Sequence, residues 1–157
     1  MKVVVQRSKE ASVSVEGNVV GSIEHGLVLL VGFTEGDSIN EVNYMIDKII
    51  NLRIFDDDEG VMNRSLIDVN GDILSISQFT LYADTRKGRR PSYINALGGD
   101  EAIYLYRLFN AKLRESLMKV NDKLKVEEGI FGADMKVSLI NDGPVTIILE
   151  KEGNKNG

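Results

Sequence analysis

Residues 26–50, GLVLLVGFTEGDSINEVNYMIDKII, contain the two elements around which this chain is organised. The apolar run at positions 27–33, unbroken over 27–31, is typical of a buried central β-strand. Ser38 and Glu41 then have the spacing of a capping box, in which two residues bond each other's backbone at the start of a helix. Apolar side chains follow every three or four positions, at Ile39, Val42, Met45, Ile46, Ile49 and Ile50. We therefore predict a central strand followed by an amphipathic helix that packs back onto a sheet.

Short strand patterns flank this pair on both sides. We predict strands at residues 2–7, 11–15, 19–23, 53–55, 73–81, 124–126, 135–140 and 145–150. A second amphipathic helix begins near Asp100 as its N-cap, with an apolar stripe at Ala102, Leu105, Leu108, Phe109, Leu113, Leu117 and Val120. The sequence therefore predicts an α+β fold with mainly antiparallel or mixed β-sheets, barrel-like or layered, and two long amphipathic helices packed on one face.

Length and composition narrow the possible functions. The 157 residues suit one domain, at residues 1–150, and a polar C-terminal tail at 151–157 that we expect to fray. The absence of cysteine excludes disulfides, thiol nucleophiles and cysteine-ligated metals, and a single histidine, His25, leaves no His-rich site. We expect no metal and no cofactor. The net charge of −5 argues against a protein that coats nucleic acid through bulk charge.

The start of the chain and its apolar runs predict where the protein works. The first residues have no long apolar run typical of a signal peptide, and the run at 27–31 is far too short to span a bilayer. We therefore expect a cytoplasmic protein with no membrane partner.

Three segments have side chains suited to chemistry. Polar residues crowd the predicted strand at 73–81, where alternation places Ser75, Ser77 and Phe79 on one face and Ile76, Gln78 and Thr80 on the other. This is either a half-buried strand or the wall of a polar pocket. A serine or threonine hydroxyl needs a base to act as a nucleophile, and only His25 could serve as an imidazole base.

The second segment is NDGPVT at residues 141–146. It is typical of a plain turn. With a cis bond before Pro144, it would instead form a rigid turn in which two carbonyls point the same way. The third is a basic loop, which we define as residues 85–91. It is either a solvated turn or a phosphate-binding loop, and its four cations are Arg86, Lys87, Arg89 and Arg90.

Taken together, these segments resemble a known family. SQFTL at 77–81 and NDGPVT at 141–146 resemble the two signature motifs of the D-aminoacyl-tRNA deacylases, the D-tyrosyl-tRNA deacylase family. The resemblance runs nearly from end to end. The stretches VVQRSKEASVSVEG at 4–17, RPSY at 90–93 and FGADM at 131–135 are similar to that family as well.

The resemblance implies an enzyme that hydrolyses the ester between a D-amino acid and the terminal adenosine of tRNA, and that also removes mis-attached glycine. It implies a homodimer with the active site at the interface. The catalytic segment would be Ser77, Gln78, Phe79 and Thr80. A cis Gly143–Pro144 pair would reject L-amino acids, Phe131, Met135 and Asn141 would line the pocket, and Arg86, Lys87, Arg89 and Arg90 would bind tRNA.

Several alternatives stay open on the sequence alone. The ester could be attacked with help from the ribose 2′-hydroxyl, with backbone amides near Phe79 and Thr80 stabilising the oxyanion, or Thr80 could be the nucleophile. An alternative function from a different class is that of a non-catalytic tRNA- or RNA-binding module that uses the basic loop. A third is a small-molecule hydrolase that pairs Ser77 or Thr80 with His25.

Overall fold

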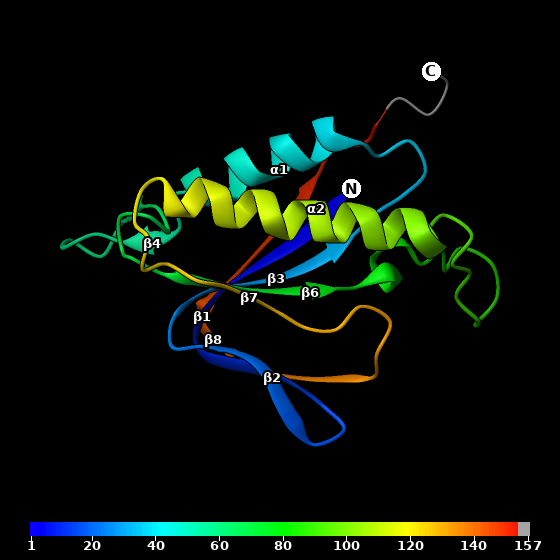
Figure 1. Cartoon of the computed structure of the whole chain (residues 1–157), viewed down its shortest axis with the longest axis horizontal. Coiled ribbons are helices and arrows are strands. Elements are labelled where there is room, and N and C mark those ends of the chain that lie inside the picture. The colour runs from blue at the N-terminus through cyan, green and yellow to red at the C-terminus, as the bar shows by residue number, and fades with distance from the viewer. Residues whose placement is uncertain (154–157) are drawn as a thin grey trace.

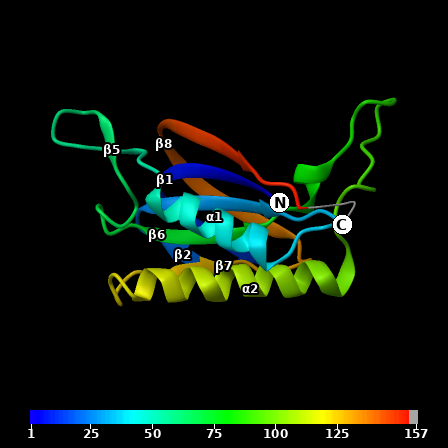
Figure 2. The same ribbon diagram turned by 90° about the horizontal axis from the view of Figure 1, so that it is seen from above.

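Two helices lie side by side across one face of a strongly curved sheet (Figures 1 and 2). The computed structural model describes residues 1–153. Its elements, in chain order, are β1 (Lys2–Val15), β2 (Asn18–Ile23), β3 (Gly26–Gly32), α1 (Ile39–Asn51), β4 (Phe55–Asp56), β5 (Met62–Arg64), β6 (Asp72–Ser77), the 3₁₀ turn η1 (Phe79–Tyr82), α2 (Gly99–Met118), β7 (Val126–Glu128) and β8 (Met135–Glu150).

The main sheet is mixed and nearly closes into a barrel. Its order is β2–β1–β3–β6–β7, and β8 pairs with the other edge of β1. The pairs that involve β1 are antiparallel, whereas β3–β6 and β6–β7 are parallel. Strand β1 pairs with β3 in its first half and with β2 in its second half, so it bends and curls the sheet. The predicted mixed α+β fold is confirmed.

Several predicted strand boundaries are wrong. Residues 2–7 and 11–15 are parts of the single strand β1, and residues 135–140 and 145–150 are parts of β8. The β1–β8 ladder shifts register near Ser8, and these irregularities let pairing continue past residues that favour turns. A short strand, β5, was not predicted and pairs with β4, while β7 begins two residues later than expected.

The two helices begin as local chemistry favours. At α1, Ser38 and Glu41 form the predicted capping box. At α2, the N-cap is Gly98 rather than Asp100, which lies in the first turn, where the positive end of the helix dipole favours a carboxylate.

Within residues 1–153, no helix is both long enough and apolar enough to cross a bilayer.

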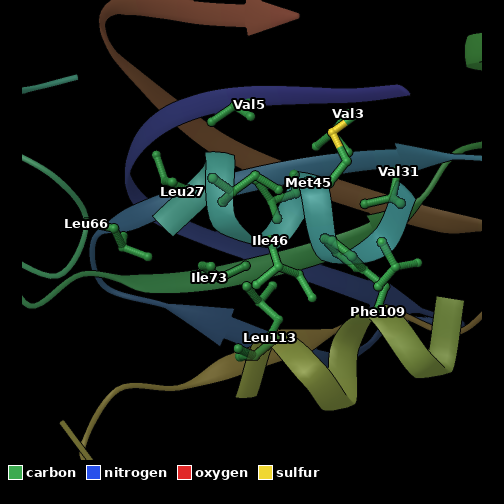
Figure 3. Close-up of a cluster of buried hydrophobic side chains, with 14 of the residues drawn as sticks. Val3, Val5, Leu27, Val31, Met45, Ile46, Leu66, Ile73, Phe109 and Leu113 are labelled. Carbon is green, nitrogen blue, oxygen red and sulfur yellow. The ribbon is translucent and has the colours of Figure 1, made fainter. Parts of the chain in front are cut away.

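The main core lies between the helices and the sheet (Figure 3). It joins side chains from β1, β3, β6, α1 and α2, among them Val3, Val31, Ile73, Met45 and Phe109. A second buried cluster fills the other face of the curved sheet, at Ala11, Val13, Ile23, Val28, Leu74 and Ile76. Strand β3 contributes to both clusters, so it is buried on both faces, and the predicted buried central strand is confirmed.

The start of the chain is fixed against its far end. The Met1 ammonium donates to the Asp37 carboxylate at 2.9 Å and to the Lys151 carbonyl at 2.8 Å. The Lys151 amide donates to the Met1 carbonyl at 3.0 Å. The expectation that the tail frays therefore does not hold at Lys151, and its last residues, 154–157, lie outside the described part of the chain.

Candidate functional site

The predicted catalytic segment lies where β6 ends and η1 begins. Ser77 is the last residue of β6, and the Gln78 amide donates to the Val31 carbonyl at 2.7 Å. Strand β3 ends at Gly32, one residue after Val31. The residues that follow Gln78 therefore no longer have β3 as a pairing partner, and the chain turns into η1. The prediction that this strand continues to residue 81 is wrong, so strand alternation does not apply to Phe79 and Thr80.

The η1 turn is held in place by short-range contacts. The Gln78 side-chain amide donates to the Thr80 hydroxyl oxygen at 2.5 Å. A Cβ at Gly32 would stand 3.0 Å from the Gln78 carbonyl oxygen and 3.2 Å from the Leu81 Cβ, so the turn packs directly on the backbone of β3. The amides of Phe79 and Thr80 occupy the start of the turn, where N–H groups have no acceptor within the helix. These two donors can serve a ligand.

A pocket of about 250 Å³ opens beside this turn. The end of β3, the end of β6 and the loop between β7 and β8 form its walls. Its lining residues are Val31, Gly32, Phe33, Ile76, Ser77, Gln78, Phe79, Leu97, Ala102, Phe131, Gly132, Ala133, Asp134, Met135 and Val137. The structure therefore brings together five of the predicted site residues, Ser77, Gln78, Phe79, Phe131 and Met135, from segments more than fifty positions apart.

A buried tyrosine supports the pocket from behind. The Tyr106 hydroxyl donates to the Ser75 carbonyl of β6 at 2.8 Å, and its ring centroid lies 5.9 Å from that of Phe131. Burial raises the pKa of Tyr106, so its phenol stays protonated and keeps donating. The sequence offered no signal for this role beyond the position of Tyr106 beside the apolar stripe of α2.

The predicted Gly143–Pro144 motif lies in the middle of β8. Its peptide bond is cis, as the resemblance implied, and both residues are exposed. The Asn141 side-chain oxygen accepts from the Val145 amide at 2.7 Å, and its side-chain nitrogen donates to the Thr146 hydroxyl at 2.8 Å. Asn141 therefore closes this turn in its own chain and is not among the residues that line the pocket.

Arg7 fixes the same turn from β1. Its Nε donates to the Asp142 carbonyl at 2.8 Å, and its Nη1 donates to the Ile54 carbonyl at 2.9 Å. The side chain is buried, and Nη1 also lies 3.3 Å from an Asp56 carboxylate oxygen. Arg7 was not among the residues predicted from the sequence. The available signal was its place in the alternation of Val3 and Val5, which puts a cation on the inward face of β1.

Within one chain, Gly143–Pro144 lies away from the pocket. Val31 at the pocket pairs with Val3, whereas β8 passes Gly143–Pro144 between its contacts with Gln6 and Ser8. From Val3 to Arg7 is four steps along β1, roughly 14 Å at about 3.4 Å per residue. His25 is also remote, because it precedes β3 at the end opposite the pocket. It cannot act as a base for Ser77 or Thr80 of its own chain.

The basic loop projects beyond the start of α2 (Figures 1 and 2). Its base is closed by two backbone hydrogen bonds between Asp84 and Ser92, at 2.7 and 2.9 Å. Arg86 folds back and donates to the Asp84 carboxylate from Nε and Nη2, which lowers the pKa of Asp84 to about 2. The remaining cations of the loop, Lys87, Arg89 and Arg90, are exposed.

Comparisons with known proteins identify the family. The sequence model of the family described as D-Tyr-tRNA(Tyr) deacylase matches residues 4–150. The chain belongs to this family. A D-aminoacyl-tRNA deacylase of Brevibacillus brevis is 59% identical over 150 residues, which cover 96% of this chain and 99% of the relative. The D-aminoacyl-tRNA deacylase of a Geobacillus species is 54% identical over 158 residues, covering 99% and 100%.

Solved structures agree with this D-Tyr-tRNA(Tyr) deacylase fold. A protein titled c-Myc DNA Unwinding Element Binding Protein superposes with a TM-score of 0.89 at 39% identity, covering 98% of this chain and 100% of the other. A probable eukaryotic D-amino acid tRNA deacylase has a TM-score of 0.79 at 17% identity, covering 94% and 97%, and supports the fold alone. The predicted family and the predicted enzyme class, a hydrolase, are confirmed.

Proposed function

We propose that this protein hydrolyses the ester of D-aminoacyl-tRNA, releases the D-amino acid and free tRNA, and spares L-aminoacyl-tRNA. The observation that supports the proposal is that η1 begins at the pocket, with Phe79 among the lining residues, because the first N–H groups of such a turn have no acceptor within it and would be free to bind an ester carbonyl. Relatives that are more than half identical over nearly their whole length are named D-aminoacyl-tRNA deacylases. Such a role would be performed in the cytoplasm, where charged tRNA is used.

The chemistry needs little from the side chains. The aminoacyl ester is already reactive, and the neighbouring ribose 2′-hydroxyl can assist water in attacking its carbonyl carbon. The amides of Phe79 and Thr80 would hold the developing oxyanion, and one such donor contributes about 2.7–4 kcal/mol to catalysis. Breakdown of the intermediate cleaves the bond between the acyl carbon and the 3′-oxygen. The D-amino acid keeps the oxygen of the attacking water, and a proton from that water converts the 3′-oxygen to the free ribose hydroxyl. Thr80 is a poor candidate for the nucleophile because its hydroxyl accepts from Gln78 and no base lies beside it among the described contacts.

A second copy of the chain would complete the site. Gly143 and Pro144 are exposed in the single chain and lie roughly 14 Å from its own pocket along β1. A homodimer in which each copy inserts this pair into the pocket of the other accounts for both facts. The contacts from Arg7 and Asn141 would keep the inserted turn rigid.

The inserted pair would select by chirality. The Gly143 and Pro144 carbonyls would bind the substrate amino group and leave no space for a side chain of L configuration, whereas a D side chain would point out of the pocket. Glycine has no side chain to exclude, so glycine mis-attached to tRNA would also be hydrolysed. The basic loop would hold the acceptor stem through phosphate contacts.

The second candidate is a nucleic-acid-binding module without turnover. It is favoured by one observation, the similarity to a protein whose title describes binding to a DNA unwinding element. The net charge of −5 limits this role to a local patch such as the basic loop.

Hydrolysis of matched esters tests the proposal. Purified protein is incubated with D-tyrosyl-tRNA and, separately, with L-tyrosyl-tRNA, and the free amino acid is measured with time. We expect rapid loss of the D ester and no acceleration of L ester loss. Equal rates for the two esters would contradict chiral selection, and binding of tRNA without hydrolysis of either ester would favour the second candidate.

A further inference from the structure

An exposed aromatic pair lies between the pocket and the basic loop. Phe79, which lines the pocket, contacts Tyr93 edge to face with ring centroids 5.0 Å apart. Phe79 is 55% exposed and Tyr93 42% exposed, and the adjoining Ile94 is 83% exposed. Both rings therefore keep open surface although they already pack on each other.

The backbone around Tyr93 is held firmly. Ser92 pairs with Asp84, the Thr34 hydroxyl donates to the Asn95 carbonyl at 2.6 Å, and the Leu97 amide donates to the Phe33 carbonyl at 2.9 Å. These bonds tie the segment to the end of β3, which also forms a wall of the pocket. A ring placed in this way needs no ordering on binding, which favours affinity.

The charge near Tyr93 is suited to a phosphate backbone. The basic loop precedes it directly, and Lys87, Arg89 and Arg90 are exposed there, whereas Arg86 is neutralised by Asp84. The other exposed tyrosines differ. The Tyr44 ring is already faced by the ammonium groups of Lys48 and Lys151. Tyr104 lines a hollow with Asp100 and Glu101, whose carboxylates would repel phosphate.

We propose that Tyr93 stacks the base of the nucleotide that precedes the terminal adenosine of the bound tRNA. The single-stranded 3′ end then runs from the pocket, over Tyr93, to the basic loop. An aromatic face beside a row of cations is the arrangement that binds single-stranded nucleic acid without reading its sequence. This inference rests on the proposed function, because that function sets the terminal adenosine in the pocket.

Two substrates of different length test the subsite. One is the D-tyrosyl ester of adenosine, which has no preceding nucleotide, and the other is the D-tyrosyl ester of the trinucleotide CCA. For Tyr93→Ala we expect kcat/KM on the CCA ester to fall about 5- to 150-fold, through KM, which is the usual effect of losing one stacked base. Hydrolysis of the adenosine ester should be unchanged, and Tyr93→Phe should restore the CCA ester.

Tyr104→Ala is the matched control, since it removes a tyrosine that is even more exposed than Tyr93, 64% against 42%, from an acidic surface. Equal losses on the two esters in Tyr93→Ala would overturn the proposal and make Tyr93 a support for Phe79. A shift of the variant from dimer to monomer would also overturn it, by making the aromatic pair part of a subunit contact.

A binding measurement separates this subsite from the proposed function. Uncharged CCA and adenosine are titrated into the full-length wild type and into Tyr93→Ala by calorimetry. Weaker binding of CCA alone in the variant supports the stacking site even if the wild type hydrolyses neither ester, a result that would refute the deacylase function itself. Unchanged CCA binding would refute the stacking site and leave the deacylase function standing.

Discussion

Substitution of Gly143 by alanine is the sharpest perturbation of the proposed selective turn. Gly143 has φ of +138°, a region that side-chain-bearing residues rarely adopt. A Cβ there would lie 2.7 Å from Val145 Cγ2, 3.0 Å from the Val145 nitrogen and 3.1 Å from Arg7 Nη2. Alanine must therefore change the backbone angle or push away the guanidinium that binds the Asp142 carbonyl. Either change moves the turn.

The effect has a predictable size. A backbone strain of this kind costs about 1–3 kcal/mol, which in a domain of about this length lowers Tm by roughly 2–12 °C. We expect selectivity between D and L esters to suffer more than stability does, because a displaced Gly143 carbonyl would no longer exclude an L side chain. The ratio of D to L hydrolysis should fall well below that of the wild type.

Thermal unfolding and the paired D- and L-tyrosyl-tRNA assay measure the two effects. The matched control is Gly17→Ala in the β1–β2 turn, where φ is +80° and a Cβ would meet nothing within 4 Å. The control should lose some stability but keep the D/L ratio. A Gly143→Ala protein that keeps both its Tm and its D/L ratio would refute the account of how this turn is held and used.

Three further predictions concern the chemistry and the tRNA contacts. Replacing Lys87 and Arg89 with glutamine should raise KM for tRNA and reduce the slope of log K against log salt by about 0.7–0.9 per lost contact. Arg86→Gln should change both quantities little, because Asp84 already neutralises Arg86. Equal effects of the two sets of substitutions would contradict the assignment of tRNA contacts to Lys87 and Arg89 rather than to Arg86. Thr80→Ala should keep most of kcat while a substrate without the ribose 2′-hydroxyl reacts slowly, and the reverse pattern would make Thr80 the nucleophile. His25→Ala should hydrolyse D-tyrosyl-tRNA at the wild-type rate; a large loss would revive a hydrolase that uses imidazole.

The parts of the fold that depend only on residues adjacent in the sequence could be predicted from it. The apolar run of β3 and the capping box at Ser38 and Glu41 are both read from a few adjacent positions, and both are present. The end of β6 could not be read in this way. The polar side chains after Ser77 still look like a strand, but the ladder stops because its partner, β3, ends at Gly32.

The same distinction between local and long-range features applies to the candidate site. Ser77–Thr80 and Gly143–Pro144 were found through motifs that resemble a family. The structure places Ser77, Gln78 and Phe79 of the first motif in the lining of a pocket, whereas Thr80 is not among the lining residues. The supporting residues were missed because their partners are distant in sequence. Arg7 bonds a carbonyl in β8, and Tyr106 bonds one in β6. A cation in a valine-rich strand and a tyrosine beside an apolar stripe do not reveal those partners.

If Gly143–Pro144 of a second copy completes each pocket, mixing two inactive variants should restore activity. Ala133→Trp fills the pocket that Ala133 lines. Gly143→Trp adds bulk at an exposed position that would enter the other copy's pocket. Both variants are first checked for folding by thermal unfolding and for inactivity on D-tyrosyl-tRNA.

After unfolding and refolding the two variants together at equal concentration, half of the dimers are mixed. In each mixed dimer, one site combines the intact pocket of one copy with the intact Gly143 of the other. We expect recovery of about a quarter of the wild-type activity per chain, as a two-fold symmetric dimer requires. No recovery from two folded variants that form mixed dimers would contradict it, because a site built within a single chain cannot be restored by mixing.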